Sequence, residues 1–320
     1  MTLTPAPEPV VPRPGCEVRP TAIGPGAPES PHGPEAGPGP DPGPGCGLGP
    51  GPGPGPDAAP CRDAGPWRDA GPGRGARTGS DAGPGPDAGP GPLLPRAVCE
   101  AALTALLLFL IVTAVRWLVG PDPGAAAARP AVLGGVVGTL LALFMMSPPG
   151  RCSGGHLNPA VTLALWRLGV FPGREVVPYA VAQSAGSVVG VWCAGLVWGP
   201  VTGRPPVRHA SVRADPAWGD AAVLAAEAGV LAGSTLMLAV LLGSPGGRRV
   251  LPYAVGLTTA VVIGVLGPLS GGSANPARQF GPALLAGETG RLWVYVLGPA
   301  LGAVLGAWLA GLAGLRRPPR

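Results

Sequence analysis

Six long apolar runs follow residue 95 of this chain. They occupy residues 97–119, 131–147, 178–198, 221–243, 251–269 and 291–314. Most of these runs reach the roughly 20 residues that an α-helix needs to cross the hydrocarbon core of a bilayer. Because backbone polar groups cannot stay unpaired in lipid, spans of this kind must be helical. The sequence therefore predicts an all-α, multi-pass membrane protein with its transmembrane helices in residues 96–316.

The composition agrees with a chain that is part membrane protein and part low-complexity tail. Charged residues make up 12% of the 320 residues, too few to coat a soluble globule of this size. Gly and Pro crowd residues 1–95 and mostly alternate, whereas collagen needs Gly at every third position. With few large apolar residues to bury, this segment is predicted to be a disordered tail; a protein-docking role is the alternative.

Several function classes find no support in the sequence. Residues 96–320 carry an excess of Arg, but no aromatic residues are interleaved with it, so no nucleic-acid partner is expected. The Cys residues form no CxxC pair, and no metal or cofactor is predicted. The spans hold no Ser/His/Asp set and no phosphate-binding loop, and His156 is the only His in this region of spans and breaks. An enzyme is therefore not expected.

The chain after residue 95 contains an internal repeat. The sequence SerGlyGlyHisLeuAsnProAla at 153–160 is matched by SerGlyGlySerAlaAsnProAla at 270–277. One acid lies upstream of each copy, Glu100 and Glu227, near the start of a span. Each half, 97–198 or 221–314, holds three spans, and an odd number gives the halves opposite orientations. Interrupted segments in two inverted halves point to a pathway at the membrane midplane.

Each break is predicted to begin a short helix. Asn is a strong N-cap and Pro is favoured at the first helical position. These residues are Asn158, Pro159 and Ala160 in one half and Asn275, Pro276 and Ala277 in the other. In an inverted repeat the two N-termini meet, and their partial positive charges repel cations. The two Asn amides would then act as donors to a passing solute.

The residues around these motifs are predicted to complete a pore. Extended backbone is expected to point carbonyl groups at the lumen, since irregular backbone at membrane depth is tolerated where it lines a cavity. The predicted carbonyls belong to Gly154, Gly155, His156, Gly271, Ser273 and Ala274. Arg278, at membrane depth, is expected to be functional. Glu100 and Glu227 are predicted to accept hydrogen bonds from the loops; the alternative is a proton-coupling role.

Two Asn-Pro-Ala motifs in matched halves, with Arg278 after the second, resemble the aquaporin or major intrinsic protein family. The resemblance covers residues 96–316. It implies six transmembrane helices plus two half-helices in an inverted repeat, a pore in each subunit and a homotetramer in the cell membrane. It also implies the structural role for Glu100 and Glu227. A weak Arg bias between the two sides places both termini in the cytoplasm.

The family pattern also implies which residues select the solute. Its narrow positions fall on Gly138, Ile263, Gly272 and Arg278. Two glycines and no aromatic side chain imply a wide filter that passes water, glycerol, urea and undissociated metalloid acids. The stretches 267–278 and 292–299 are similar to nodulin-like intrinsic proteins and their bacterial relatives, whereas Gln279 and Ala283 depart from the glycerol facilitators. A strict water channel and a coupled secondary transporter are the alternatives.

Overall fold

The computed structural model describes residues 92–118 and 128–315, which form helices joined by loops. Residues 1–91 of the predicted tail lie outside the described residues, as do residues 316–320. The first helix, α1, spans Leu93–Leu118 and so begins before residue 96, where the channel domain is predicted to start. Pro95 does not prevent this start, since the first turn of a helix has no partner for its N–H groups.

Within the described ranges, six helices are long and apolar enough to cross a membrane, as predicted. Their bounds follow the apolar runs within a few residues. They are α1, α2 (Arg129–Met146), α5 (Val176–Trp198), α6 (Asp220–Gly243), α7 (Gly247–Leu266) and α9 (Leu292–Leu312).

Three shorter helices interrupt this series. The predicted half-helices are α4 (Pro159–Arg167) and α8 (Pro276–Ala286). The third, α3 (Pro148–Ser153), was not predicted. Ser147 caps α3 by accepting a hydrogen bond from the Gly150 N–H at 3.2 Å, and two prolines follow at its first positions. Short 3₁₀ turns lie at η2 (Gly173–Glu175), η3 (Gly199–Thr202) and η4 (Arg208–Ala210).

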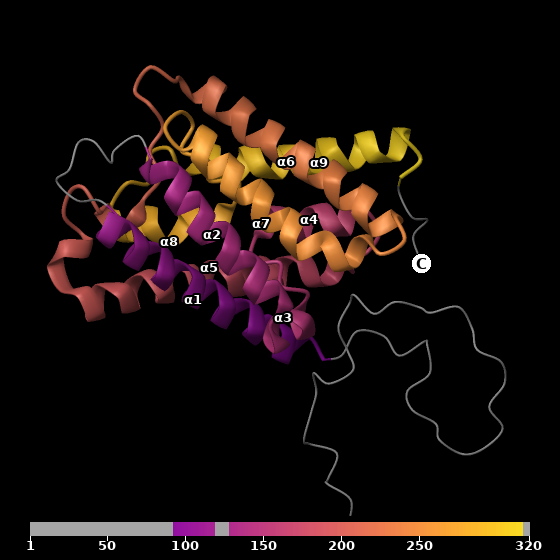
Figure 1. Ribbon diagram of the computed structural model, residues 1–320, viewed down its shortest axis with the longest axis horizontal. Helices are drawn as coiled ribbons and strands as arrows, with labels where there is room; N and C mark the ends of the chain where they lie inside the picture. Colours follow the sequence, from indigo (N-terminus) through magenta and orange to yellow (C-terminus); the bar gives the residue numbers. More distant parts are fainter. Residues whose placement is uncertain (1–91, 119–127, 316–320) are drawn as a thin grey trace, which may run out of the picture. The chain divides into compact units, whose positions relative to one another are not determined.

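Three helix pairs make the most extensive contacts: α1 with α5, α6 with α9, and α2 with α7. These helices run alongside one another in Figure 1. Small residues allow the close approach in both halves. Gly186 and Gly190 of α5 lie against the α1 backbone, and Gly302 and Gly306 of α9 lie against the α6 backbone. The two halves therefore use matching helix pairs.

The pair α2 and α7 joins the two halves through its own small residues. A Cβ atom added to Gly138 would overlap the carbonyl oxygen of Gly256, and one added to Gly134 would overlap that of Ala260. Small residues four positions apart on facing helices are typical of tight packing in membranes. Gly134 and Gly138 thus form the α2 side of this interface.

Candidate transport pathway

Two neighbouring cavities lie between the helices. The first, here called the central cavity, has a volume of about 100 Å³ and contains both Asn158 and Asn275 in its lining. The second, here called the mouth cavity, has a volume of about 240 Å³. Four residues line both cavities and therefore form the boundary between them: Val137, Ile263, Gly272 and Arg278.

Three of the four predicted filter residues lie at this boundary, and one does not. Gly138 lies in the α2–α7 interface and lines neither cavity, whereas Val137 lines both. Consecutive residues of an α-helix point about 100° apart, so an offset of one position moves a residue from the cavity to the interface. Of the two predicted filter glycines, only Gly272 therefore lies at the boundary between the cavities.

The half-helices begin as the motif predicts. The Asn158 side-chain oxygen accepts hydrogen bonds from the N–H groups of Ala160 at 2.9 Å and Val161 at 3.4 Å. The Asn275 oxygen accepts from Ala277 at 2.9 Å and Arg278 at 3.2 Å. Each Asn therefore satisfies two of the N–H groups that a helix start leaves without partners.

The same two side chains connect the two halves of the chain. The Asn158 Nδ2 donates a hydrogen bond to the Ala274 carbonyl, and the Asn275 Nδ2 donates one to the Leu157 carbonyl, both at 2.9 Å. Each nitrogen carries two hydrogens, and the bond to the opposite loop uses one of them. These reciprocal bonds bring the N-termini of α4 and α8 together at the central cavity.

The acids predicted to be structural are buried and contact the loops. Glu100 accepts hydrogen bonds from the N–H groups of His156 at 2.9 Å and Leu157 at 2.7 Å. Glu227 accepts from the N–H groups of Ser273 at 3.2 Å and Ala274 at 2.6 Å. Each carboxylate therefore holds two consecutive N–H groups of the loop before a half-helix.

The loops are tightly turned and not extended as predicted. Left-handed φ angles occur at Gly154 (100°), Gly155 (59°) and Leu157 (47°), and the second loop repeats them at Gly271 (95°), Gly272 (57°) and Ala274 (48°). Successive N–H groups of an extended strand point in opposite directions, so they could not both reach one carboxylate. The turned backbone resolves this conflict.

Most of the predicted carbonyl residues line the central cavity. Gly271 is the exception, because it lines the mouth cavity. The others are Gly154, Gly155, His156, Ser273 and Ala274. The His156 ring lies near Thr162, with Nδ1 at 3.1 Å from its hydroxyl, and packs edge-on against Phe171.

Sequence reasoning missed a second set of loop supports. The Ser153 hydroxyl accepts a hydrogen bond from the Gly155 N–H at 3.1 Å, and the Ser270 hydroxyl accepts from Gly272 at 3.2 Å. The Tyr179 hydroxyl donates to the Ser153 carbonyl at 2.8 Å, and the Tyr295 hydroxyl to the Ser270 carbonyl at 2.7 Å. The internal repeat could have predicted these contacts, because each motif begins with Ser and is followed by a Tyr at almost the same distance.

Arg278 is held by the chain that joins α5 to α6. Its Nη1 donates to the Ala210 carbonyl at 2.8 Å. The neighbouring Gln279 contacts the same segment, since its Oε1 accepts from the Val212 N–H at 2.8 Å and its Nε2 donates to the Val212 carbonyl at 3.1 Å. The boundary therefore depends on a loop distant in sequence.

Comparison with known proteins agrees with this architecture. The "Probable aquaporin AqpM" of Archaeoglobus fulgidus is 40% identical over 173 residues, which cover 50% of this chain and 67% of that protein. "Aquaporin NIP1-3" of Oryza sativa subsp. japonica is 38% identical over 177 residues, covering 54% of this chain and 59% of that protein. This chain thus spans about three fifths to two thirds of these relatives.

A solved structure shares the fold. The aquaglyceroporin from Plasmodium falciparum superposes with a TM-score of 0.59 at 19% sequence identity, over 68% of this chain and 96% of that one. The family model described as "Major intrinsic protein" matches residues 93–310, a range that contains all the described helices except the last two residues of α9. With the paired half-helices inside the matched region, this chain belongs to the major intrinsic protein family.

Proposed function

We propose that this chain is a passive channel for water and small uncharged solutes, such as glycerol, urea and undissociated metalloid acids. Its relatives are named aquaporins, which are channels and not enzymes, and the solved structure it resembles is titled an aquaglyceroporin. The observation that carries the proposal is that Asn158, Asn275 and the loops before the half-helices line a largely apolar central cavity.

The chemistry of this cavity suits solutes that are polar on one side. Leu107, Val161 and Val230 are among its apolar lining residues, and Asn158 and Asn275 are among its polar ones. The second amide hydrogen of each Asn is the donor offered to a solute, and the loop carbonyls are the acceptors. A small polyol or an undissociated acid can exchange its hydration for these contacts while its apolar side faces the hydrophobic wall.

Charge at the same places opposes the passage of cations. The N-termini of α4 and α8 each carry about half a positive charge, and Arg278 lies at the boundary between the cavities. Fixed positive groups of this kind exclude protons and cations from channels. The proposed pathway therefore selects neutral solutes.

The surroundings of the pore form the second part of the proposal. The chain is a multi-pass membrane protein of its family. We place it in the cell membrane, with its halves inverted, both termini in the cytoplasm and the mouth cavity on the outer side. A homotetramer, with one pore in each subunit, completes the assembly.

The size of the boundary is tested by the variant Val137→Trp. An indole at this position fills the space beside Ile263 and Gly272, so glycerol and urea permeability is expected to fall by at least about tenfold, the effect of a barrier of roughly 1.4 kcal/mol. Water permeability should fall less, since water is the smaller solute. Stopped-flow light scattering on proteoliposomes measures both.

Gly135→Trp is the matched control, because Gly135 is exposed on the same helix and a Cβ there meets nothing within 4 Å. Fast water flux with no solute entry in the unmodified protein would leave a strict water channel. Solute entry that requires an ion gradient would contradict the passive mechanism and favour a coupled transporter.

A further inference from the structure

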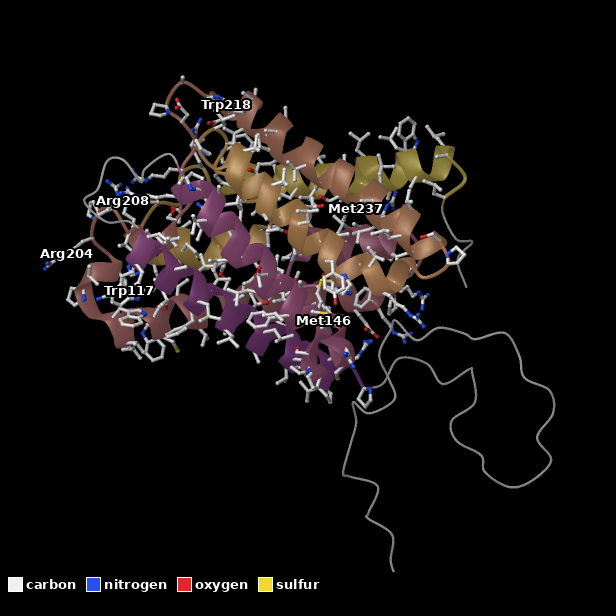
Figure 2. All side chains as sticks on the ribbon, viewed as in Figure 1. Trp117, Met146, Arg204, Arg208, Trp218 and Met237 are labelled. Atoms are coloured by element: carbon white, nitrogen blue, oxygen red, sulfur yellow. The ribbon has the colours of Figure 1, made fainter. Side chains whose placement is uncertain are left out.

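The chain between α5 and α6 forms one wall of the mouth cavity. The mouth segment, residues 204–215, contributes Pro206, Val207 and Ala210–Arg213 to its lining. Figure 2 shows Arg204 and Arg208 at the end of the bundle where α1 stops, near Trp117. The mouth segment therefore lies at the entrance to the pathway.

The mouth segment contains an unusual turn. Three consecutive residues have left-handed backbone angles, with φ of 46° at Arg208, 54° at His209 and 59° at Ala210. None of them is Gly, and such angles are costly for residues with a Cβ atom. A turn of this kind persists only where surrounding contacts hold it. Its last residue, Ala210, provides the carbonyl that accepts from Arg278.

One carboxylate outside the mouth segment contacts two of its arginines. Glu288 lies in the short loop between α8 and α9. Arg213 donates to it through Nε at 2.9 Å and through a second, shorter contact of Nη2. Arg208 lies at 3.4 Å through Nη1. Glu288 thus binds one arginine inside the turn and one just after it.

We infer that Glu288 is a positioning residue for Arg278, which it holds at the wall of the pathway by fixing the turn that carries the Ala210 carbonyl. This inference rests on the proposed function. When the carboxylate is lost, the turn relaxes and its carbonyl leaves the guanidinium. Arg278 then moves into the opening, and solutes larger than water are excluded.

The ratio of glycerol to water permeability is the measurement that reports this change. The full chain is studied in proteoliposomes as unmodified protein, Glu288→Gln and Glu288→Asp. Glu288→Gln is expected to lower the ratio by about tenfold. This is about the factor by which the loss of one charged hydrogen bond changes an equilibrium constant. Glu288→Asp keeps the charge and is expected to recover part of the ratio.

Asp220→Asn is the matched control. Asp220 accepts a hydrogen bond from Arg291 at 2.7 Å, so this pair is also an acid–arginine pair, at the first residue of α6 and just before α9, but it does not include the mouth segment. Asp220→Asn should leave the ratio unchanged. A Glu288→Gln ratio equal to that of Asp220→Asn would overturn the inference. Absence of glycerol flux in the unmodified protein would instead refute the proposed function.

The pH dependence of the permeability ratio is a second measurement. It would not change if Glu288 only stabilised the fold. Hydrogen bonds from Arg213 hold the pKa of Glu288 below its usual value, with smaller contributions from Ser211 and Arg208. The ion pairs of Glu288 with Arg208 and Arg213 are therefore complete at neutral pH and are lost only as the pH falls below about 4.3, the ordinary pKa of Glu. The ratio should drop there in the unmodified protein and stay flat in Glu288→Gln.

His209 lies within the turn itself, and burial lowers its pKa. A drop at low pH that persists in Glu288→Gln would assign the effect to His209 and overturn the role of Glu288. If Glu288→Gln folds poorly, the unmodified protein is compared with Glu288→Asp instead. A fall of the permeability ratio at a different pH in Glu288→Asp supports the role of the carboxylate. A fall at the same pH contradicts it.

Discussion

Glu100→Gln and Glu227→Gln are each expected to yield little folded protein and no solute flux. Each carboxylate accepts two backbone N–H groups in the interior of the bundle. A Gln side chain presents its own NH₂ to one of these donors, so one buried N–H loses its acceptor at a cost of about 1–3 kcal/mol. The loops also hold strained angles that depend on these bonds.

The yield of monodisperse protein in detergent and its thermal unfolding temperature measure this effect, with Asp220→Asn as the control at a partly exposed acid in the first residue of α6. The result also separates two roles for the acids. A proton-coupling acid of a transporter would be dispensable for folding. Folded Glu100→Gln and Glu227→Gln proteins that lose only a pH-driven flux would contradict the structural role.

Gly138→Val is expected to disrupt the bundle and not merely narrow the pore. A Cβ atom at Gly138 overlaps the Gly256 carbonyl, which belongs to the backbone of α7 and cannot rotate away. The helices α2 and α7 must then separate along their extensive contact. Overpacking of this kind costs about 1–3 kcal/mol or more. Lower thermal stability and lower flux of water and glycerol together are the expected readouts.

Gly135→Val provides the comparison on the same helix, because a Cβ there meets nothing within 4 Å. It should behave like the unmodified protein. If Gly138→Val instead folds normally and loses glycerol flux alone, Gly138 faces the pathway and the assignment of Val137 to the boundary is wrong.

The sequence predicted the helices and the half-helices well because their signals are local. A long apolar run identifies a spanning helix, and an Asn-Pro pair at the start of an apolar run identifies a capped helix start. The short helix α3 was not predicted, because its six residues, PPGRCS, are rich in Pro and Gly and were assigned to the break between a span and a half-helix. The capping Ser147 and the two prolines after it were the available signals.

The loops before the half-helices were predicted in place but not in shape. Their Gly content suggested exposed carbonyls, and these residues do line the cavities. The left-handed turns follow from the carboxylates of Glu100 and Glu227, which lie more than forty residues away along the chain. No local pattern could reveal which N–H groups each acid would bind.

By itself the sequence determined six spans and two capped half-helices, and it predicted paired Asn residues and an Arg at the pathway. Only the tertiary structure decided that Val137 and not Gly138 lines the cavities, and that Glu288 binds Arg213 of the mouth segment. The physical reason is the same in both cases. The rotation of α2 is set by its contact with α7, and the Glu288–Arg213 pair joins residues 75 positions apart, so both depend on how distant segments pack.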